Sequence, residues 1–189
     1  KDADAVIIRS ATTITKEVIN SAEKLLVIGR AGIGLDNVDV NAATEQGIMV
    51  VNAPKSNILS AAEHTIALIL AQARNIPQAN SALKSGRWER NEWTGVELAD
   101  KTLGIIGLGR IGKLVAQRAL AFGMNLVAYD PFVAAERARQ LSVQLMSLKE
   151  LIQISDFLTI HVAKTPETEN LINAELLSHA KPCLRIINV

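Results

Sequence analysis

The sequence is poor in cysteine, and Cys183 is the single example among its 189 residues. A lone cysteine excludes a disulfide within the chain and favours a reducing compartment, so we expect a cytoplasmic protein. Cysteine and histidine nowhere form a cluster with the spacing of a metal site, and we expect no bound metal. The chain must therefore rely on an apolar core, for which its 49% of hydrophobic residues is sufficient.

An excess of charge of one sign is also missing, because 20 basic and 19 acidic residues leave a formal net charge of +1. So small a charge does not favour nucleic acid or a membrane surface as a partner. The longest strongly apolar stretch, Ile66 to Ala71, is too short to span a bilayer. We therefore expect neither nucleic acid nor a membrane among the partners.

Short runs of Val, Ile and Leu alternate with helical patterns along the chain. This alternation is typical of βα units and of a parallel sheet. Tetrapeptides beginning at Ser60 and at Ser147 each fit a capping box, which marks the start of a helix. The predicted strands are 5–8, 25–28, 48–51, 103–106, 126–128, 157–160 and 185–187, and helices are predicted at 60–74 and 77–85.

The most informative motif is the glycine loop Gly107-Leu-Gly-Arg-Ile-Gly112, which follows a buried strand and opens an amphipathic helix. Gly107 permits the tight turn, Gly109 lets the backbone approach a pyrophosphate, and Gly112 lets helix and strand pack closely. The N–H groups and dipole of the helix start attract phosphates. Asp130 ends the next strand, 21 residues after Gly109, where a carboxylate binds ribose hydroxyls and repels a 2′-phosphate. The pattern predicts an NAD site; the alternative is a glycine turn that binds nothing.

Residues 52–57 have the composition of a linker and separate two sets of βα units. We therefore predict an α/β chain with two doubly wound, parallel-sheet, Rossmann-like domains, both incomplete in this chain. Residues 1–53 would form part of a flavodoxin-like substrate-binding domain, and residues 54–189 most of an NAD-binding domain. Because ligands of such sheets bind at the carboxyl ends of the strands, the residues just after each strand matter most.

Two arginines and a second glycine loop follow the predicted strands of the first set. Arg9 comes directly after one strand, and Arg30 lies within the loop Gly29–Gly34 after the next. Arginines beside backbone N–H groups suit an anionic substrate, either a carboxylate or a phosphate. The alternative interpretation is that both arginines are solvated strand ends, and position alone does not decide between the two. His161 likewise either contacts the cofactor or has a structural role at a strand end.

With both sets in view, the chain resembles the D-isomer-specific 2-hydroxyacid dehydrogenases along essentially its whole length. The most specific segments are Ile8-Arg-Ser-Ala-Thr12, Gly29-Arg-Ala-Gly-Ile-Gly-Leu-Asp-Asn-Val-Asp39, Val51-Asn-Ala-Pro54, Ser56-Asn57, Ser60-Ala-Ala-Glu63, Trp88-Glu-Arg90 and Gly107-Leu-Gly-Arg-Ile-Gly112. Within the family it is most similar to members that oxidise 3-phospho-D-glycerate to 3-phosphohydroxypyruvate with NAD⁺, the first step of serine biosynthesis. The alternatives are an enzyme for another D-2-hydroxy acid, such as glycerate or lactate, and a non-catalytic, NAD-sensing corepressor of the same fold.

The resemblance implies an anion site and a cofactor site. For the substrate it implies contacts with Arg9, Ser10, Arg30, Gly32, Ile33, Gly34 and Asn57. For NAD it implies contacts with Gly107, Gly109, Arg110, Ile111, Gly112, Asp130, His161, Val162 and Val189. It also implies that the catalytic Arg, Glu and His lie beyond Val189, so we expect no catalytic residue in this chain and no turnover by it alone.

The helix predicted at 60–74 carries Ile66, Leu68, Ile69 and Leu70, which cover more than one of its faces. A helix that is apolar this far around is usually buried on several sides. We therefore expect this helix and the loop after it to form part of a two-fold interface. The resemblance likewise implies a homodimer or homotetramer.

Overall fold

The computed structural model describes residues 2–189, which divide into two compact units between Ile58 and Leu59. Residues 2–58 are called unit 1, and residues 59–189 are called unit 2. The boundary predicted from the sequence lay between Ala53 and Pro54, so residues 54–58 stay with unit 1 instead. The turn after Ala53 explains this difference, because the N–H and hydroxyl of Ser56 both donate to the Ala53 carbonyl, at 3.2 and 3.0 Å.

Unit 1 is built on a parallel sheet of order β1-β2-β3, comprising Ala5–Ile8, Val27–Arg30 and Met49–Asn52. Helices α1 (Lys16–Asn20) and α2 (Val40–Glu45) connect these strands. Ile8 pairs with Arg30, and Arg30 pairs with Asn52, so the carboxyl ends of the three strands form one row. Arg9 directly follows β1, as the sequence predicted. The placement of Arg30 in the loop after a strand at 25–28 is wrong, because the pairing with β1 and β3 extends β2 to Arg30, which is its last residue.

The two faces of the unit 1 sheet differ in their packing. Ile8 and Ile28 pack on one face against Ile19 of α1 and the α2 helix, and this cluster is the core of the unit. The opposite face carries Ile7 and Met49, which are 81% and 64% exposed. Parallel sheets are normally covered on both faces, and the described part of unit 1 supplies no helix to this one. The flavodoxin-like assignment of the unit therefore stays a prediction.

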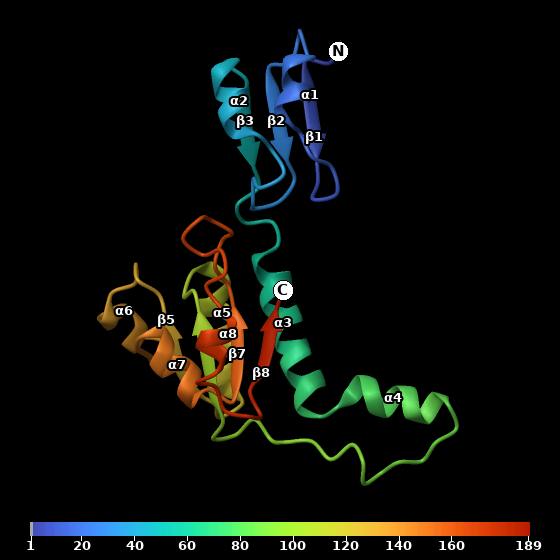
Figure 1. Ribbon diagram of the computed structural model, residues 1–189, viewed down its shortest axis with the longest axis vertical. Coiled ribbons are helices and arrows are strands. Elements are labelled where there is room, and N and C mark those ends of the chain that lie inside the picture. Colours follow the sequence, from blue (N-terminus) through green and yellow to red (C-terminus); the bar gives the residue numbers. More distant parts are fainter. Residues whose placement is uncertain (1) are drawn as a thin grey trace. The chain divides into compact units, whose positions relative to one another are not determined.

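Unit 2 contains a parallel sheet of order β6-β5-β4-β7-β8 (Figure 1). Its strands are β4 (Thr102–Ile106), β5 (Asn125–Tyr129), β6 (Val143–Leu145), β7 (Phe157–Ile160) and β8 (Arg185–Asn188). The chain adds β5 and β6 on one side of β4 and then returns to add β7 and β8 on the other. This reversal creates a topological switch point at the carboxyl ends of β4 and β7, where ligands of such sheets bind.

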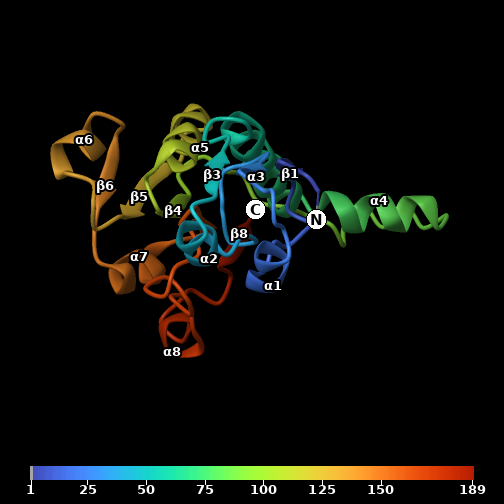
Figure 2. The same ribbon diagram turned by 90° about the horizontal axis from the view of Figure 1, so that it is seen from above.

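Helices cover both faces of the unit 2 sheet, as seen from above in Figure 2. Helices α3 (Ile58–Ala73) and α5 (Arg110–Ala121) pack on the face that carries Leu103 and Ile105. Helices α7 (Leu148–Ile154) and α8 (Ala174–Leu177) pack on the other face, which carries Ile106. Neighbouring residues of β4 thus enter opposite cores, as the alternation of side chains along a strand requires. The doubly wound, parallel α/β architecture predicted from the sequence is confirmed for unit 2.

Two further helices belong to unit 2, and the first of them packs on the sheet through Ala138, which is buried in the same core as Leu103. Helix α6 (Ala135–Arg139) precedes the edge strand β6. Helix α4 (Ile76–Lys84) projects away from the sheet, and the chain returns from it as an extended segment (Figure 1). Among residues 2–189, no helix is both long enough and apolar enough to cross a membrane.

The two predicted capping boxes have different outcomes. The box at Ser147 is confirmed, because its hydroxyl accepts from the N–H of Glu150 and the Glu150 carboxylate accepts from the N–H of Ser147. The box at Ser60 is wrong, because α3 begins at Ile58 and Ser60 lies inside its first turn. The turn at residues 54–57 leads directly into the helix, so the helix starts before the serine is reached.

Asp156 holds together the edge of the sheet at which β4 and β7 begin. Its carboxylate accepts from the N–H of Thr102 and from Nζ of Lys181, both at 2.8 Å. Burial alone would raise the pKa of Asp156, but these two hydrogen bonds and the positive charges of Lys181 and Lys101 outweigh it and lower the pKa. The carboxylate therefore stays ionised at neutral pH, at the edge opposite the glycine loop.

Candidate functional site

The glycine loop begins at Gly107, where β4 ends. Its φ of +90° lies in the left-handed region, which residues with a side chain rarely adopt. A Cβ at this position would also lie 2.6 Å from the carbonyl oxygen of His161, which follows β7. The N–H of Gly107 donates to the carbonyl of Tyr129 at 2.9 Å, so the loop is fixed to β5 as well. Only glycine satisfies this position, for conformational and for steric reasons.

The start of α5 lies directly against this loop. A Cβ at Gly112 would collide with the carbonyl oxygen of Gly107, so the first turn of the helix and the end of β4 are in close contact. Gly109 is the N-cap residue, and a Cβ there would meet open space. In the described part of the chain, no side chain caps this helix start through a hydrogen bond. Its N–H groups and its dipole thus point toward open space, as a phosphate site requires.

Asp130 is bound to the same loop. One oxygen of its carboxylate accepts from the N–H of Leu108 at 2.8 Å, and the other accepts from the N–H of Phe132 at 2.9 Å. Each carboxylate oxygen has two lone pairs, so both can still accept from further donors such as ribose hydroxyls. The acid therefore has a fixed orientation beside the loop and retains hydrogen-bonding capacity.

A cavity of about 580 Å³ opens between the glycine loop and the segments that follow β5 and β7. This volume is within the range of small-molecule and cofactor sites, roughly 300–1,000 Å³. Predicted cofactor contacts among its lining residues are Gly107, Gly109, Asp130, His161 and Val162. Lining residues that the sequence did not single out are Tyr129, Pro131, Phe132, Ala163, Thr165, Glu167, Thr168 and Leu171.

His161 is largely buried at the wall of this cavity. Its Nε2 lies 2.9 Å from the hydroxyl of Thr159, which is completely buried. Burial lowers the pKa of His161 to about 4. The imidazole is therefore neutral at physiological pH, and it offers the cavity a hydrogen-bonding group without a charge.

The other predicted cofactor residues, Arg110, Ile111, Gly112 and Val189, do not line this cavity. Arg110 and Ile111 form the first turn of α5, the former exposed and the latter half-buried. Val189 follows β8 and is 52% exposed. The chain thus brings the loop, the acid and His161 together, whereas Val189 lies outside the cavity lining.

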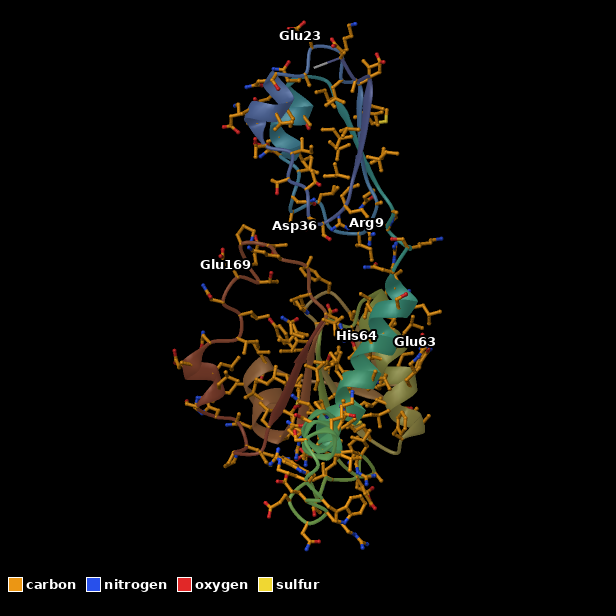
Figure 3. The ribbon with its side chains drawn as sticks, turned by 90° about the vertical axis from the view of Figure 1, so that its right-hand side faces the viewer. Arg9, Glu23, Asp36, Glu63, His64 and Glu169 are labelled. Atoms are coloured by element: carbon orange, nitrogen blue, oxygen red, sulfur yellow. The ribbon has the colours of Figure 1, made fainter. Side chains whose placement is uncertain are left out.

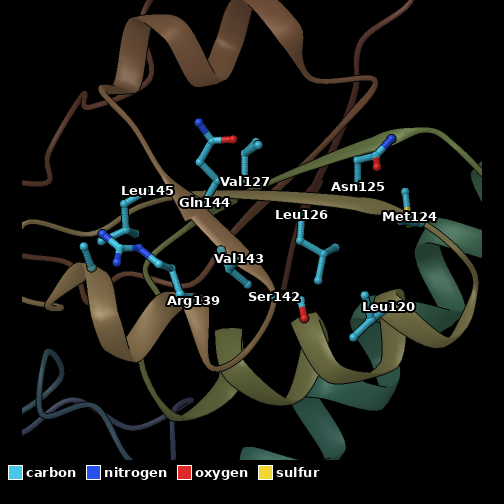
Figure 4. Close-up of a pocket in the computed structure, with 11 residues that line it drawn as sticks. Leu120, Met124, Asn125, Leu126, Val127, Arg139, Ser142, Val143, Gln144 and Leu145 are labelled. Carbon is cyan, nitrogen blue, oxygen red and sulfur yellow. The ribbon is translucent and has the colours of Figure 1, made fainter.

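A second hollow in unit 2, of about 780 Å³, lies between α5, α6, β5 and β6 (Figure 4). It is larger, but its lining is mainly apolar and includes neither the glycine loop nor Asp130; Arg139 is a charged residue in it. Its size alone does not make it the cofactor site, because a dinucleotide needs phosphate and ribose partners. Within residues 2–189, no group of three or more His, Cys, Asp or Glu side chains could hold a metal ion.

In unit 1, the predicted substrate residues follow the row formed by the strand ends. The guanidinium of Arg30 lies over Gly32, where a Cβ would collide with its Nη1. The N–H of Ala53 donates to the Gly32 carbonyl at 2.9 Å, and Nδ2 of Asn52 donates to the Ile33 carbonyl at 2.7 Å. Loop 31–34 is thereby held against the end of β3. The N–H groups of Ala31 and Gly32 already donate to the carbonyls of Ile8 and Arg30, both at 2.9 Å, so the donors that this loop can offer an anion are the Arg30 guanidinium and the N–H groups of Ile33 and Gly34.

The remaining predicted substrate residues are on the surface of unit 1. Arg9, Ser10, Gly34 and Asn57 are all exposed. Figure 3 shows Arg9 at the same end of unit 1 as Asp36. Among residues 2–189, no hydrogen bond or ion pair of the Arg9 side chain is found. Its guanidinium is therefore available to an anion.

No sequence pattern assigned a role to Asn37, although it lies within the glycine-containing segment 29–39. It is 7% exposed, and its side-chain amide contacts the backbone at Arg9 and Thr12 and the Arg30 side chain. A polar residue just before an apolar one is too common a pattern to reveal such contacts.

Residues 66–189 match the family described as D-isomer specific 2-hydroxyacid dehydrogenase, NAD binding domain. The D-3-phosphoglycerate dehydrogenase of Mycobacterium tuberculosis is 54% identical over 187 residues, covering 99% of this chain and 35% of that protein. Its namesake in Synechocystis is 53% identical over 185 residues, covering 98% of this chain and 33% of that protein. A D-lactate dehydrogenase from Aquifex aeolicus, complexed with NAD and lactic acid, superimposes with a TM-score of 0.91 at 33% identity, covering 100% of this chain and 56% of that one.

The chain spans about a third of the length of the curated relatives that it matches. The family match includes the glycine loop, Asp130 and the cavity between them. On this match, the chain belongs to the family of D-isomer-specific 2-hydroxyacid dehydrogenases, and residues 66–189 belong to its NAD-binding domain.

Proposed function

We propose that the whole protein oxidises 3-phospho-D-glycerate to 3-phosphohydroxypyruvate with NAD⁺, as a D-3-phosphoglycerate dehydrogenase of serine biosynthesis. The observation that carries the proposal is the pair of arginines at the carboxyl ends of adjacent, paired strands of unit 1. Arg30 lies over a glycine backbone, and Arg9 has an exposed guanidinium. Relatives of that name at 50–54% identity support the same substrate. A cytoplasmic location, which the single cysteine favours, is part of the proposal.

The residues of unit 2 fit NAD. The bare Cα of Gly109 and the open start of α5 would admit a pyrophosphate, and Asp130 would accept hydrogen bonds from the adenosine ribose. The carboxylate would repel a 2′-phosphate, so NAD is preferred over NADP. His161, neutral and partly buried, would present a hydrogen-bonding group to the cofactor without adding charge.

The residues of unit 1 would hold the substrate. Arg9 and Arg30 would bind its phosphate and carboxylate, while the N–H groups of Ile33 and Gly34 and the amide of Asn57 would complete the site. The N–H of Gly32 already donates to the Arg30 carbonyl. NAD⁺, when bound, accepts the hydride that leaves C2 of the hydroxy acid. The proton of the C2 hydroxyl needs a base, which the family resemblance assigns to a histidine beyond Val189.

A steady-state assay tests this function. The full-length protein is incubated with NAD⁺ and with 3-phospho-D-glycerate, D-glycerate or D-lactate, and NADH formation is followed by absorbance. We expect the highest kcat/KM with 3-phospho-D-glycerate and no NADH formation by the purified 189-residue chain. A higher kcat/KM with D-lactate would overturn the substrate assignment, and turnover by the 189-residue chain would overturn the placement of the catalytic residues.

We also infer that α3 and the segment after it form a two-fold interface between copies of the protein, giving a homodimer or homotetramer. The projecting helix α4 and the segment after it leave large apolar side chains in solvent: Ile76 is 51%, Leu83 58% and Trp88 80% exposed. Contiguous exposed apolar surface of this kind usually marks an interface. The same patch on each copy would meet across a two-fold axis.

Sedimentation of the full-length protein at micromolar concentration checks the assembly. We expect a dimer or tetramer in the native protein and a shift toward monomer in Leu83→Asp, because a charge would be buried at the interface. Leu120→Asp is the control, since Leu120 is an exposed leucine on α5 in the same unit. A native monomer, or dissociation by both variants alike, would contradict the interface.

A further inference from the structure

Asn37 lies where three loops of unit 1 meet at the carboxyl ends of the strands. It is 7% exposed, and no family resemblance assigned it a contact with substrate or cofactor. Its backbone pairs with another segment, because its carbonyl accepts from the N–H of Ile14 at 2.9 Å. A buried amide side chain is costly unless its polar atoms are satisfied, so its partners show what it does.

The nitrogen of the Asn37 amide holds the turn that carries Arg9. Nδ2 donates to the carbonyl of Arg9 at 2.9 Å and to the carbonyl of Thr12 at 2.6 Å. These carbonyls lie at the two ends of the turn, which the N–H of Thr12 closes by donating to Arg9 at 3.3 Å. The two hydrogens of one amide thus fix both ends of the turn that follows β1.

The oxygen of the same amide faces the second arginine. Oδ1 lies 3.5 Å from Nε of Arg30, which donates to it. The guanidinium of Arg30 is also confined by Gly32, over which it lies. One planar amide therefore contacts the backbone of Arg9 on one side and the side chain of Arg30 on the other. Asp36, which directly precedes Asn37, is exposed, and Asp39 caps α2 by accepting from the N–H of Ala42 at 2.9 Å.

We propose that Asn37 is a positioning residue for the substrate anion, because it sets the spacing between Arg9 and Arg30. The inference rests on the proposed function, in which both arginines bind the phosphorylated acid. The chemistry requires an amide: an aspartate keeps the acceptor toward Arg30 but cannot donate to the two carbonyls. A leucine of similar size offers neither a donor nor an acceptor. Asparagine serves both partners at once, and it acts on the anion through the two arginines.

The test uses Asn37→Leu, Asn37→Asp and Asn37→Ser in the full-length protein. We expect KM for 3-phospho-D-glycerate to rise about tenfold in Asn37→Leu, the loss associated with one misplaced charge-assisted contact. A larger rise is expected in Asn37→Asp, because its carboxylate pairs with Arg30 and competes with the substrate anion. The change in kcat should be smaller, and the Kd of NADH should not change. Inorganic phosphate, used as a competitive inhibitor, should bind more weakly in parallel with KM.

Ile19→Val is the matched control for stability, since Ile19 is a buried core residue of the same unit whose apolar side chain makes no hydrogen bond to either arginine loop. It should lower Tm while leaving KM and phosphate inhibition at their native values. Asn37→Ser, whose short hydroxyl cannot reach both carbonyls, provides a folded variant if a larger change prevents folding. The positioning role would be overturned if the folded Asn37 variants kept the native KM. It would also be overturned if Ile19→Val raised KM as it lowered Tm. Native KM in Arg30→Ala would instead overturn the anion site, and with it the proposed function.

Discussion

Replacing Asp130 by alanine is expected to weaken NADH binding about 10- to 100-fold, because hydrogen bonds to a charged group contribute about 1.5–3 kcal/mol each and water compensates for part of the loss. NADPH should lose less, because the carboxylate that repels its 2′-phosphate is gone. The carboxylate also accepts from the N–H groups of Leu108 and Phe132, so some weakening for both cofactors will come from the loop itself. The measured quantity is therefore the ratio of the two dissociation constants, by fluorescence titration of the full-length protein.

Two further variants separate the ribose contact from the loop. Asp130→Asn keeps the shape and one acceptor oxygen but removes the charge, so it should change the NADH/NADPH ratio with less damage to the loop. Asp156→Asn is the matched control: this acid also accepts from a backbone N–H, but at the opposite edge of the same sheet. It should reduce stability and leave the ratio unchanged. If the ratio of the NADH and NADPH dissociation constants were unchanged in both Asp130 variants, Asp130 would not be a ribose contact.

The sequence was most informative where local physics decides the structure. The strand at 103–106, the turn at Gly107 and the helix after Gly109 each follow from the residues that form them, because glycine is the residue that tolerates the φ of +90° there. The capping box at Ser147 is also a short-range feature, formed by residues three positions apart. Such features need no knowledge of the rest of the chain.

The edge strand β6 shows where sequence patterns fail. Val143–Leu145 is three residues long and follows Ser142, whose φ of +56° would be hard to foresee in a residue other than glycine. Its pairing with β5 is what makes it a strand, through the register of Leu126 with Val143. A run this short has too little alternation to be recognised, and tertiary pairing decides its structure.

The candidate site likewise contains one feature that local structure fixes and one that depends on tertiary contacts. The spacing between Gly109 and Asp130 predicted their proximity, since the βαβ unit fixes it, and the carboxylate does accept from the loop. Asn37 could not be predicted in this way, because its partners are 25 and 28 residues away and belong to a different loop. Contacts that bring separate loops together depend on the register between β1 and β2, and this register cannot be read from the sequence.

Replacing Arg9 by alanine is expected to raise KM for 3-phospho-D-glycerate about 10- to 100-fold, because a charge-assisted contact is worth roughly 1.5–3 kcal/mol. Arg9 follows β1 and Arg30 ends β2, and these strand ends are paired through Ile8 and Arg30, so both guanidinium groups start from one edge of unit 1. Two arginines exceed what a lone carboxylate needs, and the surplus suggests a phosphate as well. If Arg9 binds ground state and transition state alike, the loss will appear in KM rather than kcat.

Steady-state kinetics with two substrates on the full-length protein decides whether Arg9 reads the phosphate. D-Glycerate has no phosphate contact to lose, so its already low kcat/KM should barely change in Arg9→Ala. Lys24→Ala is the control for net charge, because Lys24 is an exposed cation just before β2, at the opposite edge of the unit 1 sheet. It should leave both substrates unaffected. Equal losses for D-glycerate and 3-phospho-D-glycerate in Arg9→Ala would mean that Arg9 binds the carboxylate or stabilises the loop, and the phosphorylated substrate would then lose its main structural support.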